Sequence, residues 1–99
     1  MSDLTRDTWI EYAILPELNR QGCLDSRVEI IKAPNTLDIL LVFHGQVIGA
    51  LFTGAITWPM QRDRDFNAIA KVIRNFRHEI ELYDKRIAAG IQPPQENTP

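Results

Sequence analysis

Residues 61–90 read QRDRDFNAIAKVIRNFRHEIELYDKRIAAG, and this stretch decides the fold. Apolar side chains recur in it at intervals of three and four residues, which places them along one side of an α-helix. Most of the remaining positions carry charged or polar residues, so we predict a long amphipathic helix. Its apolar seam consists of Phe66, Ile69, Ile73, Phe76, Ile80, Tyr83 and Ile87.

Signals at both ends of the stretch agree with a helix. Trp58 precedes a proline and is biased toward an extended conformation, so we expect the helix to begin after it, with Pro59 in the first turn. Asp65 brings negative charge to the N-terminal end of the helix dipole. At the other end Lys85 complements the dipole, and Gly90 can form a left-handed cap.

Three apolar segments upstream of this helix predict β-strands, because they are rich in Val, Ile, Leu and Phe and are separated by turn residues. These segments are residues 27–33, 36–43 and 47–58. We expect the second and third to form an antiparallel hairpin that turns at Gly45. Gly49 and Gly54 mark either bulges or places where the long helix packs close to the backbone.

The N-terminal residues predict a further helix. Thr8 and Glu11 have the spacing of a capping box, and Gly22 offers a C-terminal stop. Pro16 lies within this segment and lacks an N–H, so we expect a kink or two short helices there.

Length and composition fit one small globular domain. The chain has 99 residues, of which 44% are hydrophobic and 24% charged, so it can form a single modest core. The predicted fold is α+β, in the order α-β-β-β-α. We expect a single domain over residues 1–91 and a flexible, proline-rich tail over residues 92–99.

A transmembrane helix is an alternative for residues 39–61. This stretch contains no Asp, Glu, Lys or Arg and is long enough to span a bilayer. It would, however, place His44 and Gln46 in the membrane next to a glycine, and its β-branched residues suit strands better. A single-span membrane protein is therefore our second alternative.

The long helix is expected to extend past the small sheet. About 28 helical residues, at a rise of 1.5 Å each, would measure about 42 Å. The far end of the apolar seam then needs a cover, which either the N-terminal helix or a second copy of the chain could supply. We predict a homodimer, with large aromatic and aliphatic side chains as the first contacts to test. These are Trp9, Tyr12, Trp58, Phe76, Ile80, Tyr83 and Ile87.

A basic stripe lies opposite the apolar seam and suggests a nucleic-acid-binding accessory protein as the first alternative. Against this reading, the net charge is −2, acidic residues flank the stripe, and no aromatic side chain interleaves with it. The candidate contacts are Arg64, Lys71, Arg74, His78 and Lys85.

Catalytic and cofactor motifs are missing from the sequence. Cys23, His44 and His78 have no metal-ligand spacing, and the glycines occur singly, so no phosphate-binding loop is formed. A nuclease-type metal site would need a carboxylate and a lysine on the strand after Asp38, and residues 47–53 contain neither. We therefore expect no enzyme activity, no metal and no cofactor.

The favoured function is a non-catalytic protein-interaction or regulatory protein that acts as a homodimer and binds another protein. Cys23 is the single cysteine and excludes an intrachain disulfide. The N-terminal residues lack the apolar region of a secretion signal. These two features predict a cytoplasmic location.

Overall fold

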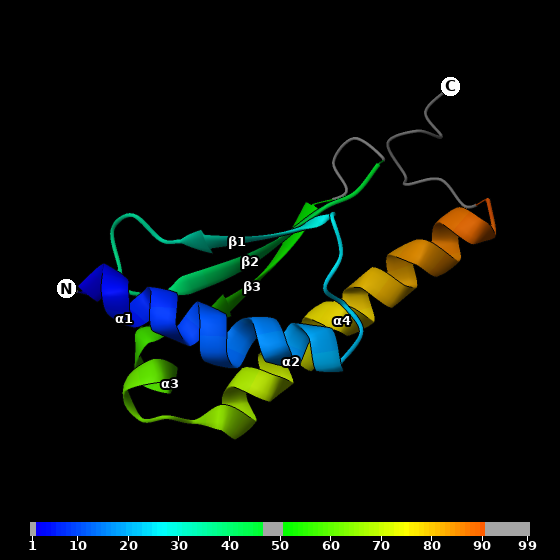
Figure 1. The fold of residues 1–99 in the computed structure, drawn as a ribbon. Helices are drawn as coiled ribbons and strands as arrows, with labels where there is room; N and C mark the ends of the chain where they lie inside the picture. The colour runs from blue at the N-terminus through cyan, green and yellow to red at the C-terminus, as the bar shows by residue number, and fades with distance from the viewer. Residues whose placement is uncertain (1, 47–50, 91–99) are drawn as a thin grey trace.

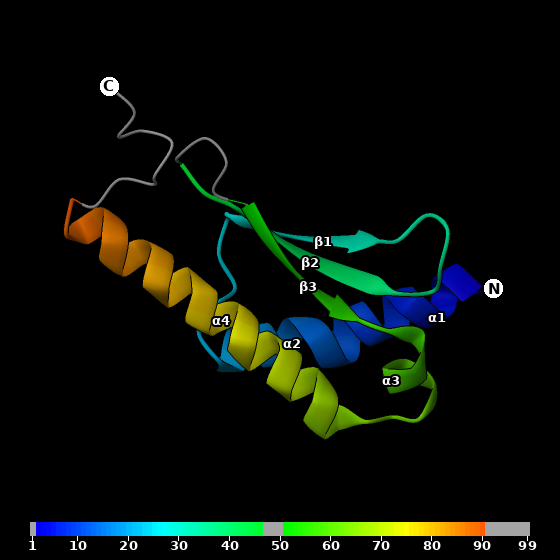
Figure 2. The ribbon, with the colours of Figure 1, turned by 180° about the vertical axis from the view of Figure 1, so that it is seen from behind.

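The computed structural model describes residues 2–46 and 51–90, and it confirms the α+β fold. The elements follow the predicted order of an N-terminal helical segment, three strands and a long C-terminal helix (Figure 1). The N-terminal segment and the long helix lie against the same face of the sheet, so the domain has two layers (Figure 2). Gly49 and the predicted tail at 92–99 lie outside the described residues.

The N-terminal segment is a rod of three elements, α1 (Ser2–Trp9), the π-helical turn η1 (Ile10–Ile14) and α2 (Leu15–Arg20). The interruption predicted at Pro16 takes the form of this π turn. Pro16 has no N–H to donate to the carbonyl four residues earlier, and the wider turn ahead of it carries a bond from the Leu15 N–H to the Ile10 carbonyl.

The start of this rod differs from the prediction made from the sequence, whereas its end agrees with that prediction. Helix α1 begins at Ser2, so Thr8 lies inside it, and the capping box predicted for Thr8 and Glu11 is wrong. The predicted stop at Gly22 is confirmed. Gly22 adopts a left-handed φ of 77°, and the Cys23 N–H donates to the Leu18 carbonyl at 3.0 Å.

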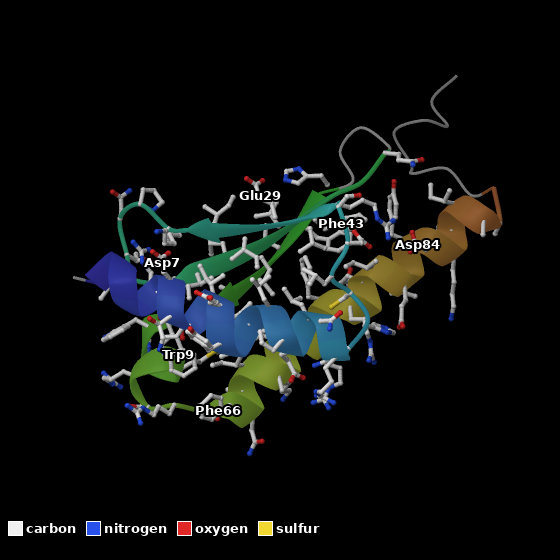
Figure 3. The ribbon with its side chains drawn as sticks, in the orientation of Figure 1. Asp7, Trp9, Glu29, Phe43, Phe66 and Asp84 are labelled. Atoms are coloured by element: carbon white, nitrogen blue, oxygen red, sulfur yellow. The ribbon has the colours of Figure 1, made fainter. Side chains whose placement is uncertain are left out.

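The sheet is an antiparallel meander in the order β1-β2-β3, formed by β1 (Val28–Lys32), β2 (Ile39–His44) and β3 (Leu51–Ile56). Side chains alternate between the two faces along each strand. On β2, Leu41 and Phe43 join the core beneath the sheet, and Phe43 points toward α4 in Figure 3. Glu29 on β1 points to the opposite face, which no described helix covers (Figure 3).

The described part of the stretch 39–61 forms strands β2 and β3 and most of the short helix α3 (Trp58–Arg62), so it does not form the single helix that the membrane-span alternative required. Its two strands pair antiparallel with each other, which satisfies their backbone groups within the sheet. Within residues 2–46 and 51–90, no helix is both long and apolar enough to cross a membrane.

Helix α3 was not predicted as a separate element. The helix begins at Trp58, and Pro59 occupies its first turn. The extended conformation that was expected of Trp58 is adopted by Thr57, the residue before the helix. The Trp58 N–H donates to Oδ1 of Asp38 at 2.8 Å. Asp38 thus caps a helix from a distant part of the chain, which the local sequence does not reveal.

The long helix α4 (Phe66–Ala88) has 23 residues and is about 35 Å long, so it is shorter than predicted. A turn at Arg64, with a left-handed φ of 53°, separates it from α3. Asp65 caps its first turn by accepting the Ala68 N–H at 3.1 Å. The predicted cap at Gly90 is confirmed by its φ of 76°.

Close packing at Gly54 sets the distance between α4 and the sheet. The register between β2 and β3 is continuous through Gly54, so this glycine marks no bulge. A Cβ atom at this position would lie 3.3 Å from Cγ1 of Val72 and 3.7 Å from Cδ1 of Phe76. The close approach proposed as one of two explanations for this glycine is confirmed.

The core lies between the sheet and the helices and receives side chains from every layer. Its ring contacts are the stack of Phe43 on Phe52, with centroids 4.5 Å apart, and the edge contact of Phe52 with Phe76 at 5.9 Å. Buried Gln61 donates from Nε2 to the carbonyls of Leu37 at 2.9 Å and Ile56 at 3.1 Å. The buried apolar cluster includes Ile14, Leu18, Ile39, Leu41, Phe43, Ile56, Ile69, Ile73, Phe76 and Ile80.

Candidate functional site

The residues predicted to contact a partner do not gather on one surface. Phe76 and Ile80 are only 3% and 5% exposed and belong to the core of the chain itself, so neither offers a surface to a partner. Tyr83 packs edge-on against Phe43 with a centroid distance of 5.2 Å, and its hydroxyl accepts the Gln46 N–H at 2.7 Å. These three residues of the apolar seam therefore hold α4 to the sheet.

The other four predicted contacts keep accessible surface. Tyr12 is 73% exposed and Ile87 is 40% exposed, whereas Trp9 and Trp58 are half-buried. Ile87 lies in the last turn of α4, which extends past the sheet as predicted (Figure 2). Their contact with a partner stays a prediction.

An apolar groove runs between the N-terminal rod and the start of α4. Its walls include Tyr12 and Pro16 on the rod, and Phe66 and Ala70 on α4. Phe66 begins the apolar seam yet is 58% exposed, with one side of its ring near Trp9 at a centroid distance of 5.5 Å (Figure 3). The groove therefore has an aromatic rim of the kind that dominates contact energies in protein interfaces.

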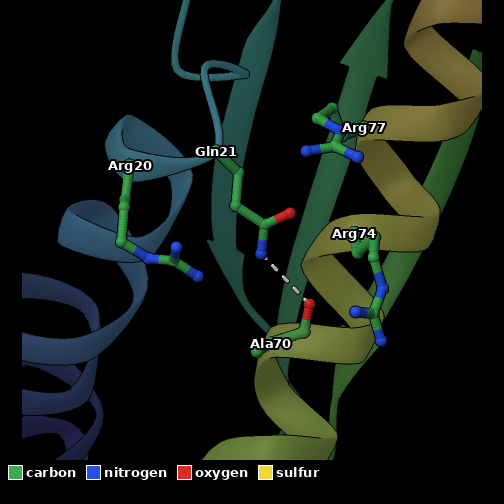
Figure 4. Close-up of a pocket in the computed structure, with 5 residues that line it drawn as sticks. All are labelled: Arg20, Gln21, Ala70, Arg74 and Arg77. Carbon is green, nitrogen blue, oxygen red and sulfur yellow. Dashed lines mark hydrogen bonds between the residues drawn. The ribbon is translucent and has the colours of Figure 1, made fainter.

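A basic pocket continues this groove along α2 and α4. Its lining consists of Arg20, Gln21, Ala70, Arg74 and Arg77. Arg20 and Arg77 extend toward Gln21 from opposite walls (Figure 4). Gln21 donates from Nε2 to the Ala70 carbonyl at 3.2 Å, which ties the end of α2 to α4. Arg20 and Ala70 line both cavities, so the apolar groove and the basic pocket adjoin each other.

The charges around the basic pocket are only partly balanced. Glu17 accepts hydrogen bonds from Arg20, and this contact lowers the pKa of the Glu17 carboxyl below its usual range. Arg77 lies 3.7 Å from a Glu81 carboxylate oxygen, and its buried Nε has no hydrogen-bond acceptor among the described residues. Arg74 has no ion pair within the described part of the chain.

The predicted basic stripe is divided by the structure. Lys71, His78 and Lys85 are exposed on α4 as expected, whereas Arg64 lies in the turn before the helix and does not belong to the stripe. Arg74 joins the basic pocket instead.

Sequence reasoning missed Arg20 and Arg77 as members of this pocket. Arg20 comes from another helix, and its position beside α4 depends on tertiary packing. Arg77 follows Arg74 by three residues, so both lie on the same side of α4, and this spacing was an available signal.

The two edges of the sheet differ in chemistry. β1 reads VEIIK and carries two charges, and its Lys32 Nζ pairs with Oδ1 of Asp7 on α1 at 2.9 Å. β3 reads LFTGAI and carries none. Its outer edge pairs with no other strand in the described part of the chain. Edge strands of natural proteins are commonly protected by charge or proline, so β3 is the unprotected edge.

Among the described residues, the geometry brings together no candidate catalytic centre. Residues 2–46 and 51–90 contain no group of three His, Cys, Asp or Glu side chains that could hold a metal ion. The Cys23 thiol is buried, and burial raises its pKa, which makes it a poor nucleophile. His44 ends β2 and lies 2.8 Å from a carboxylate oxygen of Glu29 on the exposed face.

Within residues 2–46 and 51–90, the groove and the outer edge of β3 have the chemistry of binding surfaces. Comparison of the chain with protein-family models, with characterised proteins and with solved structures finds no match.

Proposed function

We propose that this chain is a non-catalytic protein-interaction or regulatory protein that acts as a homodimer joined along β3. The observation that carries the proposal is the uncharged outer edge of β3, which pairs with no strand among the described residues. Such an edge presents a row of backbone N–H and C=O groups to any strand of matching geometry.

A second copy of the chain satisfies this edge by symmetry. Two β3 strands running antiparallel about a two-fold axis produce a closed dimer and a continuous six-stranded sheet. Pairing along Leu51–Ile56 would add up to about six hydrogen bonds, each with a net contribution of about 0.5–1.5 kcal/mol. The two-fold axis would be perpendicular to the sheet, so the helices of both copies would cover the same face.

Helix α4 favours the same arrangement. It packs on β3, where Val72 contacts Gly54, so the two copies of α4 would lie next to each other below the joined strands. The dimer would thereby bury helix surface in addition to the strand edges. The dimer is not needed to cover Phe76 and Ile80, because the chain already buries both side chains by itself.

Sedimentation velocity of edge variants tests the proposal. Ala55 is exposed on β3, so Ala55→Lys places a charge beside the pairing edge without disturbing the core. We expect the wild-type chain to sediment as a dimer of twice 11.4 kDa, and Ala55→Lys as a monomer. Asn35→Lys, which adds the same charge in the exposed turn after β1, is the matched control and should remain dimeric. A monomeric wild-type chain at high micromolar concentration, or a dimeric Ala55→Lys, would refute it.

Nucleic-acid binding is the second candidate. Lys71, His78 and Lys85 are exposed on one helix, and such a row can follow a phosphate backbone. Acidic Glu79 and Glu81 are exposed on the same helix and reduce its positive field. For this reason the protein-interaction function is favoured.

A cytoplasmic location is part of the proposal, since the single cysteine is buried as a free thiol.

A further inference from the structure

The adjoining groove and pocket between the N-terminal rod and α4 combine two chemistries in a fixed order. One end has the aromatic rim of Tyr12 and Phe66, and the other has the guanidinium groups of Arg20, Arg74 and Arg77. Phe66 and Arg77 are eleven residues apart on α4, which corresponds to about 16 Å along the helix. An extended peptide covers that distance with about five residues.

Contacts within the described part of the chain do not explain why an aromatic ring is exposed at one end and why arginines gather at the other. Tyr12 is 73% exposed and has no ring contact within the described residues. Arg74 and Arg77 have like charges three residues apart on one helix, a spacing that destabilises an isolated helix by a few tenths of a kcal/mol. Three arginines share one pocket with two carboxylate partners, Glu17 and Glu81, so the pocket keeps a positive charge.

We propose that this groove binds an acidic peptide segment of a partner protein, with an apolar side chain against Tyr12 and Phe66 and carboxylates on the arginines. The inference rests on the proposed protein-interaction function and names the chemistry of the partner. Guanidinium groups bind carboxylates through paired, charge-assisted hydrogen bonds, and Arg74 forms no ion pair within the described part of the chain. Gln21 adds a polar group to the floor of the basic end.

The lining favours a peptide over a nucleic acid. A phosphate backbone requires positive charge along its whole path, whereas the cations here occupy only one end of the groove. The opposite end is lined by Tyr12, Ala13, Pro16 and Phe66, and the carboxylate of Glu17 lies in the same wall. A peptide with an apolar side chain followed by acidic residues fits the apolar end and the basic end of the groove in this order.

The test uses a fluorescein-labelled peptide of two leucines followed by four glutamates, and fluorescence anisotropy with the full chain. We expect saturable binding that weakens by about tenfold or more in Arg74→Glu and by severalfold in Tyr12→Ala. Arg86→Glu changes an exposed cation in the last turn of the same helix and is the matched control, with an expected change below about twofold. A peptide in which lysines replace the glutamates should not bind.

Several outcomes would overturn the proposal. Equal losses in Arg74→Glu and Arg86→Glu would indicate diffuse attraction and no groove. Tighter binding of oligothymidylate, lost in Arg74→Glu, would assign the pocket to nucleic acid. Absence of binding up to millimolar peptide would also refute it. Ala55→Lys separates this inference from the proposed dimer, because a monomeric variant should still bind the peptide if the groove is correct.

Discussion

The contact between Gly54 and Val72 provides the sharpest prediction about the packing of α4 on the sheet. In a strand, replacing glycine with alanine normally stabilises a protein by about 0.5–1 kcal/mol, because the unfolded chain loses conformational freedom. At Gly54 the added Cβ would lie 3.3 Å from Cγ1 of Val72, which is closer than ordinary van der Waals contact. Overpacking of a core costs about 1–3 kcal/mol. We therefore expect Gly54→Ala to destabilise the wild-type chain by about 1 kcal/mol.

A double-mutant cycle isolates this contact. Val72→Ala removes the methyl group that meets the new Cβ, so Gly54→Ala in that background should be neutral or stabilising by about 0.5–1 kcal/mol. Ala55→Gly on the opposite face of the same strand gives the backbone term alone. Urea unfolding followed by circular dichroism measures all of these free energies at one fixed protein concentration. Equal effects of Gly54→Ala in both backgrounds would show that α4 does not approach β3 as described.

Two further predictions concern buried and paired polar groups. Gln61→Ala leaves the carbonyls of Leu37 and Ile56 without their side-chain donor, so it should lower the free energy of unfolding in urea by about 1–3 kcal/mol. Gln21→Ala removes a half-buried contact and should lower it by less. The Arg27 guanidinium lowers the pKa of the Asp25 carboxyl, so this pair stabilises the folded chain above the ordinary carboxyl pKa, and the contribution is lost as pH falls through the lowered value. Asp25→Asn should reduce stability near neutral pH and flatten its decline as the pH falls below the ordinary aspartate pKa.

Periodicity made the α+β fold predictable. The apolar seam from Ile69 to Ile80 faces the core as its spacing required, and residues 28–32, 39–44 and 51–56 form the three strands. Glycines with positive φ end α2 and follow α4 where local sequence placed them. These features depend on interactions between near neighbours along the chain, which the sequence displays directly.

Features that depend on distant contacts were not predictable in the same way. The start of α4 was misplaced because Asp38, twenty residues upstream, caps Trp58 and stabilises a separate α3. The basic pocket joins Arg20 to Arg74 and Arg77 only through the packing of α2 on α4. The exposed edge of β3 follows from the strand order, although the absence of charge in residues 51–56 was visible in the sequence.

Hydrogen exchange of the β3 amides tests the homodimer most directly. In the proposed dimer, the amides of Leu51–Ile56 that point away from β2 are hydrogen-bonded to the partner strand, so their protection should rise with protein concentration in step with the dimer fraction. The outward amides of the opposite edge strand, β1, should not respond. If the outward β3 amides exchange rapidly at every concentration, including those at which the chain sediments as a dimer, then the copies do not join along β3.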